Sequence, residues 1–238
     1  VVLLTLMVLI VLGGLGFFVW EDWLRHRNWR GLSLSSKMAL AITAALILLG
    51  AGFFLWIEWE NPMTLGSMPA GEKLLTARFQ SVAQRTAGFS VIDQGLQTDS
   101  SAVLSILLML VGGSPGSTAG GMKNTTVAVL VAAAASTFRR KESAQYFGRR
   151  IDDAVVQNAA TILLMYVFLS GAGALVLSLA EGLPLLPCLF ETASAIGTVG
   201  LSLGITPGLG TISRLLLIVL MFFGRVGGLT LIFAALSG

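Results

Sequence analysis

The chain has 238 residues, of which 55% are hydrophobic and only 11% are charged. Its mean hydropathy of +0.86 excludes an ordinary water-soluble domain, so lipid is the expected solvent for most of the chain. The net charge of +3 is too small to indicate nucleic-acid binding, and no nucleic-acid partner is expected. With a single cysteine, Cys188, the chain offers neither an intramolecular disulfide nor a cysteine-based metal site.

The first apolar segment, residues 1–20, begins without a methionine or a charged leader and ends at Trp20. It is typical of the interior of a transmembrane helix and not of a signal peptide, so we expect the end of a preceding repeat in a longer protein. Residues 21–37 are charged and form the next loop. Residues 38–57 are apolar throughout, about 30 Å of helix and enough to cross the hydrocarbon core.

Two shorter segments, 72–84 and 188–197, are too short to span a bilayer, and each precedes a small polar loop. They are typical of half-helices that enter the membrane and turn back. The apolar segment 101–113 stops in a glycine-rich stretch, 112–121, and an apolar run resumes over 127–135. The interrupted helix must face protein or a watery cavity, because its freed backbone groups would have no partners in lipid.

The basic side chains predict the orientation. Nine of the fifteen lysines and arginines lie in residues 21–37 and 138–153, so both segments are expected to be cytoplasmic loops and both half-helices to enter from outside. A pattern of span, half-helix and span then occurs twice, in residues 38–137 and 154–238. The five expected spans are residues 1–20, 38–57, the broken segment 101–135, 154–180 and 213–236.

A five-residue pattern, Thr-x-Gly-apolar-Ser, follows each half-helix. It reads Thr86-Ala87-Gly88-Phe89-Ser90 in the first unit and Thr198-Val199-Gly200-Leu201-Ser202, 112 residues later, in the second. Met109-Leu110-Val111-Gly112 and Met221-Phe222-Phe223-Gly224 keep the same offset. Two matches in one register indicate a duplicated unit.

Ion-selectivity filters replace the hydration shell of a cation with backbone carbonyl oxygens. Glycine tolerates the backbone angles that align successive carbonyls, and the C-terminal end of a half-helix adds a negative pole. We therefore predict that both loops are filter segments for an alkali cation. The alternative, that Gly88 and Gly200 allow close helix packing, is the better reading of either glycine alone; the repeated register and the half-helices favour the filter.

The chain resembles the C-terminal half of the Trk/Ktr/HKT family of potassium transporters, whose subunits carry four membrane–pore–membrane repeats around one permeation path. The matching stretches are residues 85–90, 112–123, 125–126, 198–202 and 224–227. Residues 38–137 would be repeat three and residues 154–238 repeat four, preceded by the end of repeat two. The chain departs from the family pattern at Gly228, where proline is usual.

The resemblance implies a potassium-selective filter centred on Gly88 and Gly200 and a gate formed by residues 112–121 beneath it. The filter residues, which would bind potassium through backbone carbonyls, are Thr86, Ala87, Gly88, Phe89, Thr198, Val199, Gly200 and Leu201. The gate residues are Gly112, Gly113, Ser114, Gly116, Ser117, Thr118, Gly120, Gly121 and Arg225.

Arg225 lies about 12 residues, or ~18 Å, into the last predicted span. An ionised side chain at that depth costs at least ~2.5 kcal/mol on insertion scales, so an interior partner is expected in preference to snorkelling. The exposed carbonyls and hydroxyls around Ser114, Ser117 and Thr118 are the best candidates. Arg225 is therefore expected to anchor the gate and to add an electrostatic barrier.

Three further charged residues lie near these loops. Lys123 either lines the cytoplasmic side of the pore or snorkels to the inner interface. Arg85 is expected to neutralise the terminal carbonyls of its half-helix, to hold the loop and to point away from the ion path. Glu191 is a candidate buried carboxylate, and whether it pairs with an arginine stays open.

The predicted function is potassium uptake by an all-α, multi-pass protein of the cytoplasmic membrane, without enzymatic activity. A sodium- or proton-coupled carrier is the first alternative, although carriers favour inverted repeats and these repeats share one orientation. A membrane-embedded enzyme that holds phosphate in the glycine-rich loop is the second. The resemblance also implies a homodimer and a cytosolic nucleotide-binding regulatory subunit that docks on the basic segments. No cofactor is expected, and sodium is a candidate coupling or activating ion.

Overall fold

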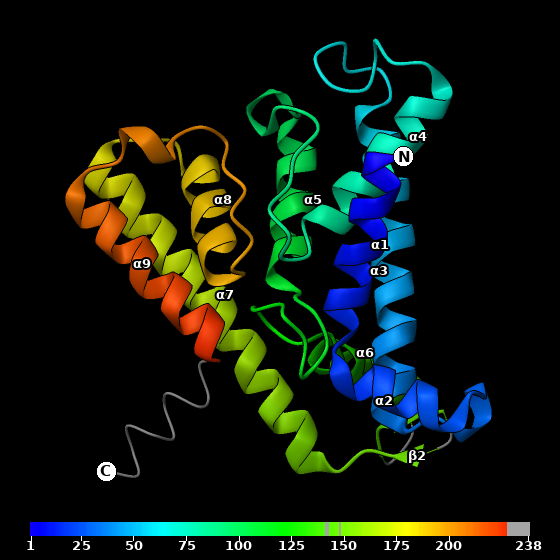
Figure 1. The fold of residues 1–238 in the computed structure, drawn as a ribbon. Coiled ribbons are helices and arrows are strands. Elements are labelled where there is room, and N and C mark those ends of the chain that lie inside the picture. Colours follow the sequence, from blue (N-terminus) through cyan, green and yellow to red (C-terminus); the bar gives the residue numbers. More distant parts are fainter. Residues whose placement is uncertain (141–142, 148, 228–238) are drawn as a thin grey trace.

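A computed structural model describes residues 1–140, 143–147 and 149–227. The chain is a helical membrane protein in which helices stand side by side, with α8, α5 and α4 toward one end and α2 and β2 at the other (Figure 1). In the described residues, α3 and α7 are each long and apolar enough to cross a membrane, and a third span results if the bent pair α1–α2 counts as one.

The segment predicted as repeat three begins at an N-cap, Ser33, whose hydroxyl accepts a hydrogen bond from Ser36 N at 3.2 Å. This cap starts the first helix earlier than the apolar run alone predicts. Thr98 caps α5 in the same way, accepting from Ser101 N at 3.3 Å. The helices of this repeat are α3 (Leu34–Glu58), α4 (Ala70–Ala83), α5 (Asp99–Leu110) and α6 (Asn124–Phe138).

The segment predicted as repeat four contains α7 (Asp153–Glu181), α8 (Leu185–Ile196) and α9 (Thr211–Val226). Gly182, with φ of 66°, ends α7 in the left-handed conformation that commonly terminates helices. The predicted span over 213–236 begins as α9, and its part beyond residue 227, including Gly228, lies outside the described residues.

The segment before repeat three corrects the prediction of one straight span over residues 1–20. Helix α1 ends at Leu15, and α2 (Phe17–His26) turns away from it by 89°. Gly16 allows the turn with φ of 79°, and a Cβ there would lie 2.7 Å from the Pro115 carbonyl oxygen. The break comes from contact with the glycine-rich loop, which the local sequence does not reveal.

The two basic segments meet at one end of the molecule (Figure 1). Residues 138–153 contain a short antiparallel hairpin, β1 (Gln145–Tyr146) with β2 (Arg149–Arg150), which the sequence did not predict. The ring of Phe147 makes an edge contact with Trp29 of the other segment, at 6.2 Å between centroids. The half-helices α4 and α8 lie toward the opposite end, as the charge distribution predicted.

Candidate functional site

The two predicted filter segments, loop three (residues 86–90) and loop four (residues 198–202), share an unusual backbone conformation. The φ angles of Thr86 and Gly88 are 66° and 72°, and those of Thr198 and Gly200 are 54° and 92°. Only five non-glycine residues in the described chain have a positive φ, and two of them are these threonines. A β-branched residue in this region is strained, so the surrounding structure must hold both loops in place.

Each loop follows the C-terminal end of a half-helix directly. The amides of Ala87 and Gly88 donate to Ala83 O, the last residue of α4, at 3.1 and 3.2 Å. In repeat four, Val199 N donates to Ser194 O at 2.9 Å. These bonds fold each loop back on its helix end, where the negative pole of the helix dipole favours a cation.

Gly88 and Gly200 are required to be glycine for different reasons. A Cβ at Gly88 would collide with the carbonyl oxygen of Val199, so loops three and four touch at this point. A Cβ at Gly200 would have no heavy atom within 4 Å, which leaves its φ of 92° as the reason for glycine. Close packing therefore explains part of the choice at Gly88 and none of it at Gly200.

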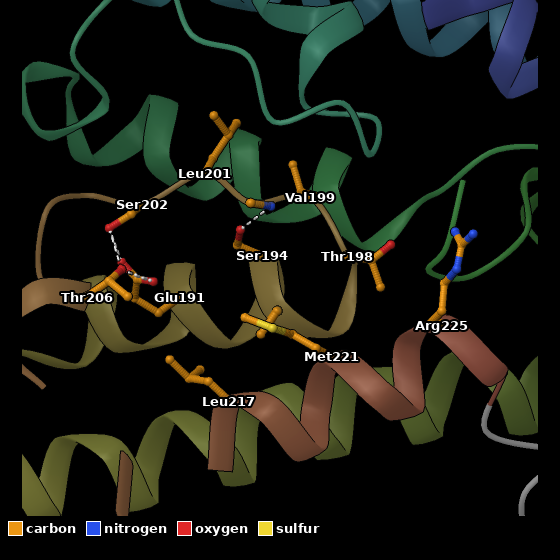
Figure 2. Close-up of a pocket in the computed structure, with 12 residues that line it drawn as sticks. Glu191, Ser194, Thr198, Val199, Leu201, Ser202, Thr206, Leu217, Met221 and Arg225 are labelled. Atoms are coloured by element: carbon orange, nitrogen blue, oxygen red, sulfur yellow. Dashed lines mark hydrogen bonds between the residues drawn. The ribbon is translucent and has the colours of Figure 1, made fainter. Parts of the chain in front are cut away.

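Loop four borders a cavity of about 430 Å³ between α8 and α9 (Figure 2). Leu217 and Met221 of α9 line it opposite the loop, and Arg225 lies at one end. At the other end, Glu191 accepts hydrogen bonds from the hydroxyls of Ser202 and Thr206, the latter at 2.8 Å.

The partner of Glu191 is thus a pair of hydroxyls and not an arginine. Its side chain is only 5% exposed, and Thr206 Oγ1 also donates to Ser202 Oγ at 2.9 Å. Ser194 adds a second support, because its hydroxyl accepts from Gly200 N at 3.1 Å (Figure 2). Sequence reasoning missed Thr206 and Ser194.

Loop three is supported by neutral amides. Gln94 Nε2 donates to Ser90 Oγ at 2.6 Å, and Gln80 Nε2 donates to Gln94 Oε1 at 2.6 Å. One helical turn after Gln80, Gln84 Nε2 donates to Ser105 Oγ at 2.7 Å. Gln94 lies 112 residues before Thr206, so the repeat register contained a signal for both supports.

The residues that flank the glycine-rich loop (residues 112–121) are paired with each other. Val111 pairs with Met122 in an isolated parallel bridge, and Gly112 N donates to Met122 O at 2.8 Å. Ser114 N donates to Gly14 O of α1 at 2.8 Å. The backbone groups freed by the helix break thus find protein partners, as predicted.

This loop also lies directly against loop four. A Cβ at Gly120 would collide with the Thr198 hydroxyl, and Gly121 N donates to Gly224 O of α9 at 3.1 Å. The Arg225 guanidinium donates to Thr118 O at 2.6 Å, which confirms the predicted contact. Ser114 and Ser117, the other candidates, do not bond Arg225.

Lys123 and Arg85 have hydrogen-bond partners that the sequence did not identify. Lys123 Nζ donates to Ala119 O at 2.7 Å, so the lysine bonds the glycine-rich loop itself. Arg85 Nη2 donates to Gly112 O at 3.3 Å and to Thr43 Oγ1 at 3.4 Å. In the described residues, the Arg85 side chain thus bonds the glycine-rich loop and α3, and it makes no hydrogen bond to the terminal carbonyls of α4.

With this geometry in place, the sequence can be compared with known proteins. The sequence pattern of the TrkH family, described as cation transport protein, matches residues 1–237. The chain belongs to the TrkH family. That family consists of cation transporters and is not an enzyme family. In the described residues, no group of three or more His, Cys, Asp or Glu side chains is placed to hold a metal ion.

Two relatives illustrate the similarity. The Ktr system potassium uptake protein B of Bacillus subtilis is 36% identical over 97% of this chain and 52% of its own length. The potassium/sodium uptake protein NtpJ of Enterococcus hirae is 39% identical over 96% of this chain and 51% of its own. The chain thus spans about half the length of the curated relatives it matches.

The fold matches a solved structure as well. The crystal structure of the potassium transporter TrkH from Vibrio parahaemolyticus has a TM-score of 0.77 to this chain at 20% identity. The match covers 98% of this chain and 51% of that one. At this identity the likeness concerns the fold alone.

Proposed function

We propose that this chain supplies half of a potassium-conducting pathway for uptake across the cell membrane. Loops three and four would contribute two of the segments whose backbone carbonyls replace the hydration shell of the ion. The observation that carries this proposal is the repeated left-handed threonine and glycine at the C-terminal ends of two half-helices that bring the loops into contact. The names of the relatives, potassium uptake proteins, supply the ion.

In the same proposal, residues 112–121 form the gate. Gly120 packs against Thr198 and Thr118 O accepts from Arg225, and these contacts support a gate that lies against loop four. A cation held at Thr118 would also oppose a passing cation, since like charges repel in a poorly hydrated passage. Opening would then require the bond between Arg225 and Thr118 O to break or to move with the loop.

The remaining filter segments would come from the other half of a longer chain, because two segments do not close a ring of four. We further propose a homodimer and a cytosolic nucleotide-binding regulatory subunit that docks near the basic segments. The relatives' designation as parts of a Ktr system supports an additional subunit. No resident cofactor is proposed, and potassium is the transported substrate.

The test is rescue of potassium-uptake-deficient cells by the full-length gene, with Gly88→Ser and Gly200→Ser variants. We expect wild type to restore growth at low potassium and both variants to lose potassium selectivity over sodium. Gly171→Ser is the matched control, because a Cβ at Gly171 in α7 meets nothing within 4 Å. Unaltered selectivity in both filter variants would refute the assignment.

Sodium is a second candidate ion, because one relative is named a potassium/sodium uptake protein. If sodium is coupled to transport, potassium uptake in the same cells should rise with external sodium at constant potassium. Uptake independent of sodium favours a potassium pathway without coupling.

A further inference from the structure

Four buried polar side chains form a network between loop three and the glycine-rich loop. They are Thr43 of α3, Arg85, Ser114 and Asn124, with exposed fractions of 5%, 8%, 0% and 0%. Buried polar groups are costly unless they are hydrogen-bonded, so a cluster of four requires a specific arrangement.

The Thr43 hydroxyl is the centre of this network. It accepts from Arg85 Nη2 at 3.4 Å and from Asn124 Nδ2 at 3.1 Å. Asn124 also donates to Ser114 Oγ at 2.9 Å, and Arg85 donates to Gly112 O at 3.3 Å. The Thr43 hydroxyl thus joins Arg85, the residue before loop three, to Asn124, which follows the glycine-rich loop.

The positions along the chain give these bonds their importance. Arg85 directly precedes Thr86, whose left-handed backbone begins loop three. Gly112 is the first residue of the glycine-rich loop, and Asn124 begins α6 just after that loop ends. A displacement of the loop therefore changes the acceptors of Arg85 and, through it, the start of loop three.

Arg85 depends strongly on those acceptors. The only ion pair within the described ranges joins His26 and Asp22, so Arg85 has no carboxylate partner there. Its Nε atom is buried without a hydrogen-bond partner in the same part of the chain. Because a buried cation must be balanced by neighbouring dipoles, each bond to Gly112 O and Thr43 Oγ1 matters more than it would in water.

Repeat four has no equivalent of this cation. The residue 112 positions after Arg85 is Gly197, where a Cβ would collide with the Met109 carbonyl oxygen. Loop four instead touches the glycine-rich loop where the Thr198 side chain packs against Gly120. A charged link between a filter segment and the proposed gate is therefore specific to repeat three.

We propose that Arg85 is a positioning residue that couples loop three to the glycine-rich loop through Gly112 O and the shared hydroxyl of Thr43. This inference rests on the proposed potassium pathway and adds to it a dependence of ion selectivity on the position of the gate. With the loop in its present place, the network holds loop three in the conformation described. When the loop moves, loop three loses that support, so selectivity and opening change together.

The experiment uses the full-length protein in liposomes and measures potassium flux, the potassium-to-sodium flux ratio and the fraction of open time. Thr43→Val removes the shared hydroxyl with little change in shape, and Arg85→Lys keeps the charge but loses the planar reach to two acceptors. We expect each variant to lower the flux ratio by about fivefold, the equivalent of one hydrogen bond, and to alter open time with it.

Thr76→Val is the matched control, because Thr76 is a buried threonine of the same segment whose one hydrogen-bond partner among the described residues is Met68 Sδ, at 3.7 Å. It should leave both readouts unchanged. A double-mutant cycle of Arg85→Lys with Asn124→Ala should be less than additive, since the two side chains share the Thr43 hydroxyl as acceptor.

The outcomes separate the two proposals. Wild-type protein that carries no potassium would overturn the proposed function itself. Wild-type flux with an unchanged ratio and open time in Thr43→Val would overturn the coupling alone. A change in open time at a constant flux ratio would also overturn it, because the network would then act on the gate without reaching loop three.

Discussion

Behind loop four, the Glu191 carboxylate accepts hydrogen bonds from Ser202 and Thr206. Behind loop three, the neutral amide of Gln94 donates to Ser90 and accepts in turn from the amide of Gln80. The serines occupy equivalent positions, and so do Gln94 and Thr206, each pair 112 residues apart. The two segments therefore keep the position of the side chain that bonds the loop serine, whereas the chemistry of that side chain differs.

The charged residues near the two loops differ as well, because each has an uncharged counterpart in the other segment. The counterpart of Glu191 in repeat three is Phe79, which is 1% exposed, and the counterpart of Arg85 in repeat four is Gly197. One loop thus has an anion behind it and the other a cation beneath it. Both keep the same pattern of φ at threonine and glycine. The backbone shape is the shared requirement, and several side-chain arrangements can hold it.

The outer ends of the repeats show the same principle with less divergence. Glu58, at the end of α3, accepts from Thr98 N at 2.9 Å, and Glu181, at the end of α7, accepts from Gly210 N at 2.9 Å. Thr98 and Gly210 are the N-cap residues of α5 and α9 and lie 112 residues apart. A carboxylate at a helix N-terminus satisfies free amides and the helix dipole, so both repeats retain it.

The largest expected difference between the loops is at their glycines. Gly88→Ala and Gly200→Ala should each cost about 1–2 kcal/mol for a left-handed alanine. Gly88→Ala should cost a further ~1–3 kcal/mol, because its Cβ meets the Val199 carbonyl. Thermal unfolding of the purified full-length protein measures both. Gly171→Ala in α7 is the control and should be neutral or stabilising. Equal losses at Gly88 and Gly200 would contradict the contact between the loops.

A smaller difference is expected at Glu191 and Gln94, the side chains that bond the loop serines. Glu191→Gln turns one acceptor into a donor that faces the hydroxyls of Ser202 and Thr206, so about 1–3 kcal/mol should be lost. Gln94→Met removes the bonds that Gln94 makes with Ser90 and with Gln80, and because all three groups are neutral it should cost less, about 1–2 kcal/mol. Denaturant unfolding and the potassium-to-sodium flux ratio should both rank Glu191→Gln as more damaging. The reverse ranking would mean that the carboxylate is not the stronger support.

The smallest effect is expected at Ser194. Ser194→Ala leaves Gly200 N without its side-chain acceptor and should cost about 1 kcal/mol. Loop three has no equivalent serine, since residue 82 is valine. The change should therefore lower selectivity through loop four alone, as the flux ratio would reveal. Ser170→Ala in α7 is a matched control at a buried serine, and an equal drop there would indicate a general packing effect.

Local patterns predicted much of this architecture. The segments 72–84 and 188–197 became α4 and α8 with shifts of a few residues, because the flanking prolines and glycines mark helix ends locally. The break at 112–121 was equally readable from its glycines and proline. The turn at Gly16 was not, since its cause is the Pro115 carbonyl, which lies far away along the chain.

The sequence by itself determined the family, the helical membrane fold and the two loops whose glycines repeat in register. Only the tertiary structure decided what holds those loops. Glu191 finds its partners 11 and 15 residues away, and Arg85 finds its partners 27 and 42 residues away. Burial requires that such groups be hydrogen-bonded, and this much follows from composition. Which atoms come within hydrogen-bond distance depends on how the helices pack, and sequence spacing does not encode it.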